Sequence, residues 1–353
     1  MSLRQIFLED IPLLDVRAPA EFARGAFPSA TNLPVLNDIE REQVGTCFKD
    51  KGADAATALG HELVKGDKRQ ERIEQWRTFI NHNPTAQIYC FRGGQRSHIS
   101  QQWLRETGIR IQLISGGYKV MRRYLLDVFE RLPTITVISG RTGVGKTVLL
   151  ERIVNSIDLE CLANHRGSAF GARLAPQPTQ IDFENALAIK VLKLDKSIVV
   201  EDEGRMIGRL TLPPQLQEKM KKASLVLLED SLSNRVCRIH QEYVVMQFAE
   251  MAEEGVESPT PRLEEKFTTA LAAIKKRLGG AGYDRIKKEM NEAFTSHKKG
   301  DVSQHKVWIE SLLRDYYDPM YDYQLGQKKG RILRTGNQDE LTGYLGTRFK
   351  NHQ

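Results

Sequence analysis

The sequence predicts an α/β protein with two domains, residues 1–130 and 131–353, the second of which ends in a helical, basic region. The chain has 353 residues, more than twice the roughly 150 residues of a single domain. Short runs of β character alternate with helical stretches along most of it, as in proteins built on parallel sheets. A helix expected over residues 118–130 ends near a proline, and a strand-like run begins at residue 134, so we place the domain boundary at about residue 131.

The first domain contains a cysteine followed by a glycine-rich loop. Cys90 ends an expected strand, and the sequence Phe-Arg-Gly-Gly-Gln-Arg leads from it into a helix expected over residues 97–107. Loop N–H groups, the N-terminal end of the helix and Arg96 would stabilise a thiolate and an anion bound to it, with Arg92 as a second cation. We therefore expect Cys90 to be reactive, the alternative being a buried, inert cysteine. The other three cysteines have no such loop, and without a CxxC pair no zinc site or disulfide framework is expected.

The second domain begins with a phosphate-binding motif. Residues 140–147, GRTGVGKT, fit the P-loop pattern G-x-x-x-x-G-K-[ST], between an expected strand and an expected helix. We therefore expect a P-loop NTPase-like domain with a parallel sheet. The glycines let backbone N–H groups point at an anion, Lys146 adds a mobile charge, and Thr147 and Asp202 would hold Mg²⁺. The expected cofactor-binding residues are Gly140, Gly143, Gly145, Lys146 and Thr147, with Glu201 and Asp202 from an acidic cluster placed like a second metal-holding motif.

Two further segments carry candidate substrate-binding residues. A polar loop combines His165, Arg166 and Ser168 with two glycines, a composition suited to contact with phosphate or base. Arg235 and Arg238 lie three residues apart on an expected helix, so they share one face. Both sets are also compatible with a solvated polar surface.

Charge and composition favour RNA as a partner. The net charge is +7, and residues 262–350 hold 18 basic and 12 acidic residues. Lysine pairs alternate there with tryptophan and tyrosine, a mixture that suits phosphates and unstacked bases, although a charged surface over an aromatic core is the alternative. No apolar stretch approaches the roughly 20 residues of a membrane span, and no signal peptide is evident. We expect a cytoplasmic protein without a membrane partner.

Longer strings in both halves resemble known families. DVRAPAEF at residues 15–22 resembles the N-terminal signature of rhodanese domains, and Cys90 falls where their sulfur-carrying cysteine lies. A rhodanese-like domain joined to a P-loop domain, with CFRGGQRS at residues 90–97, NHRGSAFG at residues 164–171 and QPTQIDFE at residues 177–184, resembles the tRNA 2-selenouridine synthase family. The resemblance spans most of the chain.

This resemblance implies a two-step reaction on tRNA. The 2-thio group of the wobble uridine in the anticodon loop is first geranylated from geranyl diphosphate and then replaced by selenium from selenophosphate, with no tightly bound cofactor. The P-loop with Lys146 and Mg²⁺ would hold the diphosphate. Cys90, with Arg92 and Arg96, would either attack selenium or assist its delivery. Two other classes stay open: an ATP-dependent kinase or ATPase fused to a rhodanese-type sulfurtransferase acting on RNA, and a non-catalytic RNA-binding protein.

Overall fold

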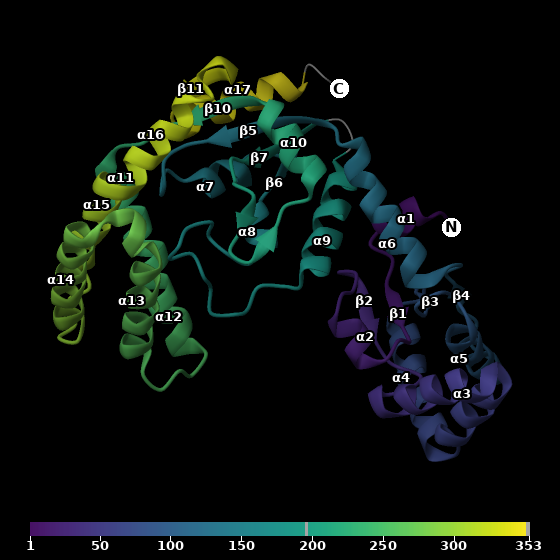
Figure 1. Cartoon of the computed structure of the whole chain (residues 1–353). Helices are drawn as coiled ribbons and strands as arrows, with labels where there is room; N and C mark the ends of the chain where they lie inside the picture. The colour runs from purple at the N-terminus through teal and green to yellow at the C-terminus, as the bar shows by residue number, and fades with distance from the viewer. Residues whose placement is uncertain (195–196, 351–353) are drawn as a thin grey trace. The chain divides into compact units, whose positions relative to one another are not determined.

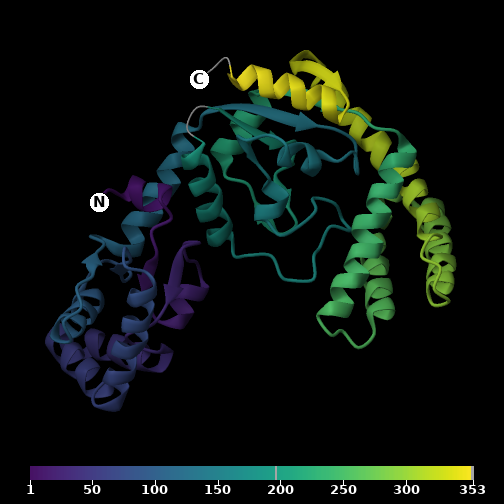
Figure 2. The same ribbon diagram turned by 180° about the vertical axis from the view of Figure 1, so that it is seen from behind.

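The computed structural model describes residues 1–194 and 197–350, which form two compact units (Figure 1, and Figure 2 from behind). The first unit comprises Met1–Arg131 and Thr179–Lys193, and the second comprises Leu132–Pro178 and the chain from Leu194 onward. The second unit therefore differs from the predicted domain of residues 131–353 by one segment, because helix α9 (Gln180–Lys193) belongs to the first unit.

The first unit is built on a four-stranded parallel sheet in the order β2-β1-β3-β4. Its core contains two stacked tryptophans, Trp76 and Trp103, whose ring centroids are 6.1 Å apart. The strands are β1 (Leu13–Asp15), β2 (Ala30–Asn32), β3 (Gln87–Tyr89) and β4 (Gln112–Leu113). The helices besides α9 are α1 (Leu3–Leu8), α2 (Pro19–Ala23), α3 (Asp38–Leu63), α4 (Asp67–His82), α5 (Gln95–Glu106), α6 (Gly117–Val128) and the 3₁₀ turn η1 (Phe129–Arg131).

Contacts around Gly25 hold α9 in the first unit. Ala26 donates its N–H to Asp182 Oδ1 at 2.7 Å and accepts a hydrogen bond from Asn185 Nδ2 at 2.6 Å. Asn185 is fully buried, and a Cβ at Gly25 would lie 2.3 Å from Ile181 Cγ2. Because Ala26 and Asp182 are 156 positions apart, the local sequence pattern carries no sign of this packing.

The second unit is built on a five-stranded parallel sheet in the order β11-β10-β5-β7-β6. The central strand β5 leads into residues 140–147, and β7, which ends in acidic residues, pairs directly with it. Parallel strands bring their carboxyl ends to one edge of a sheet, so the glycine loop and the acidic residues share that edge. The strands are β5 (Thr134–Ser139), β6 (Ser156–Ile157), β7 (Ser197–Glu201), β10 (Ser224–Leu228) and β11 (Ile332–Gly336), beside an antiparallel hairpin of β8 (Met206–Ile207) and β9 (Leu210–Thr211).

Helices cover this sheet and form a bundle beside it (Figure 1). The bundle has its own core, in which Phe267 packs on Trp308 with ring centroids 5.3 Å apart. Two segments of the bundle region are π-helical, η2 (His240–Val245) and η3 (Leu313–Tyr317). The other helices are α7 (Lys146–Glu151), α8 (Leu159–Leu162), α10 (Pro214–Lys222), α11 (Leu232–Ile239), α12 (Met246–Glu253), α13 (Pro259–Leu278), α14 (Gly280–His297), α15 (His305–Leu312), α16 (Asp318–Gly326), η4 (Lys329–Arg331) and α17 (Gln338–Lys350).

The predicted fold class is confirmed: both sheets are parallel, and the C-terminal region is largely helical. Strand β11 was not expected, since it lies in the region predicted to be mainly helical. Among the described residues, no helix is both long and apolar enough to cross a membrane.

Candidate active sites

Cys90 lines a pocket in the first unit. Cys90 directly follows β3, and α5 begins five residues later. Its Sγ lies 3.2 Å from Ser97 Oγ, which in turn donates to the Gly94 carbonyl at 3.0 Å. Although Cys90 is only 3% exposed, it lines a cavity of about 890 Å³. Cys90 therefore borders the cavity, with a hydroxyl beside its sulfur.

A second pair of glycines holds the loop after Cys90 in place. Tyr118 donates its N–H to the Cys90 carbonyl at 2.9 Å, and Lys119 donates to the Phe91 carbonyl at 3.0 Å. Gly117 has φ +55°, and a Cβ there would lie 2.1 Å from the Cys90 oxygen. The start of α6 therefore fixes the loop through backbone contacts that only glycine permits.

Cationic side chains dominate the charged lining of this pocket. The basic members are Arg17, Arg24, Arg41, Lys49, Arg92 and Arg96, against Glu21 and Glu42. We expected Arg96 to stabilise the sulfur directly, but its guanidinium pairs with both oxygens of Glu21. Burial opposes ionisation of Glu21, yet the hydrogen bond from Arg96 keeps the pKa of that carboxyl below its usual value. Arg92 is exposed and remains available to an incoming anion.

The P-loop of the second unit is held by residues from distant helices. Gly143 and Gly145 have φ values of +76° and +90°, a region open mainly to glycine. Arg238 of α11 donates to the Gly143 carbonyl, and Gln338 of α17 donates to the Gly145 carbonyl at 2.7 Å. Helices α11 and α17 therefore hold the backbone of the loop through the carbonyls of Gly143 and Gly145.

The two arginines of α11 have different roles. Arg235 is 2% exposed, pairs with Asp318 through contacts of 2.8 and 2.6 Å, and donates to the Thr142 carbonyl at 3.2 Å. Arg238 pairs with Asp230 at 2.9 Å and lines the P-loop pocket. Arg238 therefore lines this pocket as predicted, whereas Arg235 does not line it and instead holds the loop through the Thr142 carbonyl.

The polar loop of residues 164–171 also places only some of its predicted substrate-binding residues at the pocket. Arg166 and Ser168 line the P-loop pocket, whose volume is about 450 Å³. Arg166 lies over the Tyr243 ring at 5.1 Å, and its Nη1 is buried without a hydrogen-bond partner among the described residues. His165 is 8% exposed and lies outside the pocket lining. Burial and nearby positive charge lower the pKa of His165, which favours its neutral form.

Carboxylates face Lys146 across the P-loop pocket. Glu201 is 2% exposed and accepts the Glu160 N–H at 2.8 Å, while its Oε2 has no partner among the described residues. Burial and the charge of Glu203 raise the pKa of Glu160 to about 8. Burial also raises the pKa of Glu203, although Lys146 acts in the opposite direction. Glu160 carries no motif, so sequence reasoning missed it.

The predicted metal ligand Asp202 is already paired. Lys328 Nζ lies 2.8 and 2.7 Å from its two oxygens, and Ser139 Oγ donates to one of them. Thr147 lines the pocket as expected. Within residues 1–194 and 197–350, no three His, Cys, Asp or Glu side chains form a metal site. A metal ion here would therefore need oxygens from the ligand itself.

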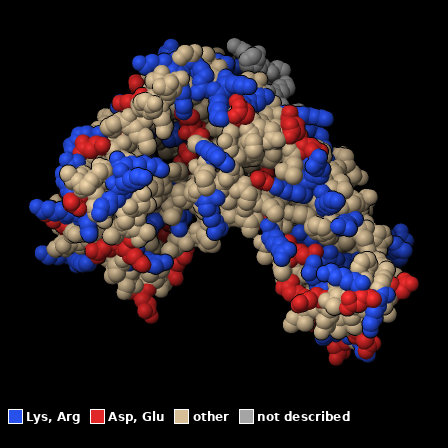
Figure 3. Space-filling view, in the orientation of Figure 1, with Lys and Arg blue, Asp and Glu red and all other residues tan. Residues whose placement is uncertain are grey.

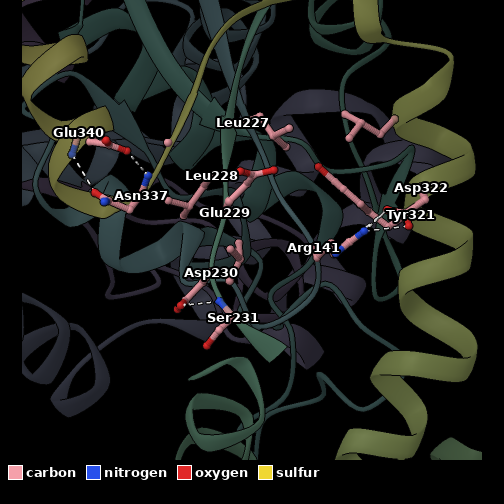
Figure 4. Close-up of a pocket in the computed structure, with 13 residues that line it drawn as sticks. Arg141, Leu227, Leu228, Glu229, Asp230, Ser231, Tyr321, Asp322, Asn337 and Glu340 are labelled. Carbon is pink, nitrogen blue, oxygen red and sulfur yellow. Dashed lines mark hydrogen bonds and ion pairs between the residues drawn. The ribbon is translucent and has the colours of Figure 1, made fainter. Parts of the chain in front are cut away.

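Two further cavities adjoin the P-loop pocket. One is an apolar recess of about 30 Å³ between α11 and α15, and the π-helical segments η2 and η3 contribute Tyr243 and Tyr317 to its lining. Thr142, Ser168, Ile239, Tyr243 and Tyr317 line both the recess and the P-loop pocket. The other, of about 540 Å³, is shown in Figure 4, where an ion pair joins Arg141 to Asp322.

The C-terminal region offers a mixed surface. Figure 3 shows basic side chains along the helical bundle with acidic groups among them. Trp308, Tyr316 and Tyr317 are buried, at 2%, 8% and 8% exposure, whereas Tyr323 is 73% exposed. Lys275 and Lys276 are exposed, and Lys275 Nζ lies 4.6 Å from the centre of the Tyr283 ring. Most of the aromatic residues considered for RNA stacking therefore belong to the core.

Comparisons with known proteins agree with this two-part architecture. A rhodanese-like domain model matches residues 3–123, and a model described as the tRNA 2-selenouridine synthase AAA domain matches residues 133–352. The tRNA 2-selenouridine synthase of Marinobacter nauticus is 46% identical over 352 residues, covering 97% of this chain and 96% of that protein. The synthase of the same name from Ectopseudomonas mendocina is 48% identical over 352 residues, covering 97% of this chain and 94% of that protein.

Proposed function

Since this chain belongs to the tRNA 2-selenouridine synthase family, we propose that it replaces sulfur by selenium at C2 of the wobble uridine in tRNA. The 2-thio group is first geranylated from geranyl diphosphate and then exchanged for selenium from selenophosphate. The P-loop serves the first step and the Cys90 loop the second. Both loops carry the features that such anionic donors require.

The observation that carries this proposal is the apolar recess that opens off the P-loop pocket. A diphosphate fits the backbone N–H groups of Gly143 to Thr147 and the charge of Lys146, which neutralise the leaving group as it departs. A geranyl chain needs an apolar surface beside the diphosphate, and Ile239 and Tyr243 supply one. Because the recess has a volume of only about 30 Å³, it would have to widen to admit the geranyl chain.

The first step is a balanced transfer that requires no nucleotide. The sulfur of 2-thiouridine attacks C1 of geranyl diphosphate, the C1–O bond breaks, and the N3 proton is lost as diphosphate leaves. Crowded carboxylates at this site suit Mg²⁺, which Thr147 and Glu203 would hold together with diphosphate oxygens. When bound, Mg²⁺ supplies further neutralisation of the leaving group. Glu203 is proposed as the carboxylate ligand in place of Asp202, because Lys328 already pairs with Asp202.

The second step takes place at the Cys90 pocket, where Cys90 assists the delivery of selenium. Selenium of selenophosphate attacks C2, the C2–S bond breaks, geranylthiol leaves with a proton, and water cleaves the P–Se bond. The cationic lining attracts both selenophosphate and the RNA backbone, and Arg92 is the exposed cation nearest to Cys90 in sequence.

An ATP-dependent kinase or ATPase remains the second candidate, favoured by the cavity in Figure 4, whose volume of about 540 Å³ suits a nucleobase. Nucleoside mass spectrometry separates the two. We expect Cys90→Ala to accumulate S-geranyl-2-thiouridine in tRNA and Lys146→Ala to leave 2-thiouridine unchanged. If both variants lose both steps equally, or if the reaction requires ATP, the proposed division of labour is wrong.

A further inference from the structure

An apolar groove lies between α3 and α5 of the first unit. Its lining includes Val44 and Phe48 from the first half of α3, Gly60 from the second half, and Ile99 and Trp103 from α5. The two halves meet at Gly52, whose φ of +85° breaks the helix. The kink lets both halves of α3 border one groove, which has a volume of about 100 Å³.

This groove continues into the Cys90 pocket. Five residues line both cavities: Leu36, Val44, Phe48, Gln95 and Arg96. Arg96 and Gln95 begin α5, directly after the loop that holds the sulfur. A ligand group at Cys90 can therefore extend into the groove past Arg96, whose guanidinium is already paired with Glu21.

The mouth of the groove exposes an aromatic side chain. Phe48 is 58% exposed and lines both the groove and the Cys90 pocket. Six cations and two carboxylates line the adjoining pocket, whereas the groove itself is mainly apolar. The combined site is suited to a ligand that is anionic at one end and apolar at the other.

We infer that this groove receives the isoprenoid chain of the S-geranylated wobble base while selenium replaces sulfur. This inference rests on the proposed function and adds a specificity site to it. An apolar cavity of about 150 Å³ holds benzene, so the smaller groove suits one five-carbon isoprene unit, with the rest of the chain against Phe48 and Val44. The groove thereby selects the prenylated intermediate over shorter S-alkyl bases.

Gly60 provides a variant that fills the groove. A Cβ at Gly60 would lie 3.8 Å from Val44 Cγ2, an ordinary contact, and leucine is a better helix former than glycine. Gly60→Leu should therefore fold and block the groove. Ala58→Leu is the matched control, because Ala58 is exposed on the same half of α3 and lies outside the lining. Phe48→Ser is a second variant with little risk to folding, since Phe48 is exposed.

The test measures selenation of an anticodon stem-loop RNA carrying either S-geranyl- or S-methyl-2-thiouridine, with selenophosphate, by the full-length protein. Each buried CH₂ group is worth about fourfold in binding, so we expect Gly60→Leu to raise KM for the S-geranyl RNA by at least about tenfold. Phe48→Ser should raise it less, and Ala58→Leu should leave it unchanged. For the S-methyl RNA, wild type and Gly60→Leu should be equally poor.

Two results would overturn the inference. One is an unchanged KM in Gly60→Leu, and the other is an equal loss for S-geranyl and S-methyl RNA. Either result leaves the proposed function intact if the wild type selenates S-geranyl RNA. If the wild type does not selenate that RNA at all, the two-step function itself fails and the groove assignment fails with it.

Discussion

Gly117 allows a sharp test of how the Cys90 loop is held. A Cβ there would lie 2.1 Å from the Cys90 carbonyl oxygen and 2.6 Å from the Gly93 nitrogen. Both are backbone atoms, which cannot rotate away as a flexible side chain does. To bring the closest contact out to 3.0 Å, the loop and the start of α6 must separate by about 1 Å.

Gly117→Ala should therefore slow selenation by more than its loss of folding stability alone would explain. An alanine in the left-handed region costs about 1–2 kcal/mol, whereas a displacement of about 1 Å at a reacting group lowers a rate by about 100-fold. Gly108→Ala is the matched control. Gly108 has φ +86° and no atom within 4 Å of its Cβ position, so this variant has the backbone cost without the displacement.

The assay follows selenation of RNA carrying S-geranyl-2-thiouridine by nucleoside mass spectrometry, with urea unfolding of each variant beside it. We expect both variants to lose stability, Gly117→Ala by more because of its backbone contacts, and a rate loss of about 100-fold in Gly117→Ala alone. Equal selenation rates in the two variants would refute the argument that Gly117 positions the Cys90 loop.

Three further predictions concern the second unit. Burial, followed by the charges of the neighbouring His297 and His240, lowers the pKa of His305 to about 3. As pH drops from about 6.5 toward 3, His305 is protonated in the unfolded chain before it is protonated in the folded protein. The free energy of unfolding should therefore fall by up to about 1.4 kcal/mol per pH unit over this range. Urea titrations at several pH values check this, and His305→Asn should show a shallower dependence. Arg235→Met leaves Asp318 without its partner and should lower the free energy of unfolding by about 3 kcal/mol, and a calorimetric change below about 1 kcal/mol would contradict the bracing role. Binding of tRNA should weaken as salt rises, by about 0.7–0.9 in log affinity per log salt for each phosphate contact, and a flat dependence in filter binding between low and moderate salt would argue against the basic surface as the RNA site.

The sequence predicted the glycine loop and its flanking elements because their signal is local. The run of β character at residues 134–139 coincides with β5, and the P-loop pattern alone indicates how the next residues turn. In contrast, β11 is an edge strand whose residues are mostly exposed. It has no apolar run, so periodicity could not distinguish it from the surrounding helices.

The roles of individual polar residues were harder to predict, because their partners lie far along the chain. Arg235 and Arg238 share one helix face, yet Asp318, 83 positions away, draws only Arg235 into the interior. Asp202 follows β7 where a metal ligand was expected, but Lys328 neutralises it from 126 positions away. Helix spacing and motif context predict where a side chain lies, whereas the partner with which it pairs depends on tertiary contacts.

The two candidate sites have the same physical arrangement. Each loop is fixed by distant residues, Gly117 at one site and Arg238 with Gln338 at the other, and rigid N–H donors are the kind that stabilise developing negative charge. Each loop also adjoins an apolar cavity. Such a pairing suits ligands in which an anionic group and an apolar chain are close together. Geranyl diphosphate and the S-geranyl base beside selenophosphate both meet this requirement, whereas ATP places a polar ribose next to its phosphates. The repeated pairing therefore favours a prenyl group handled at both sites over ATP hydrolysis coupled to sulfur transfer.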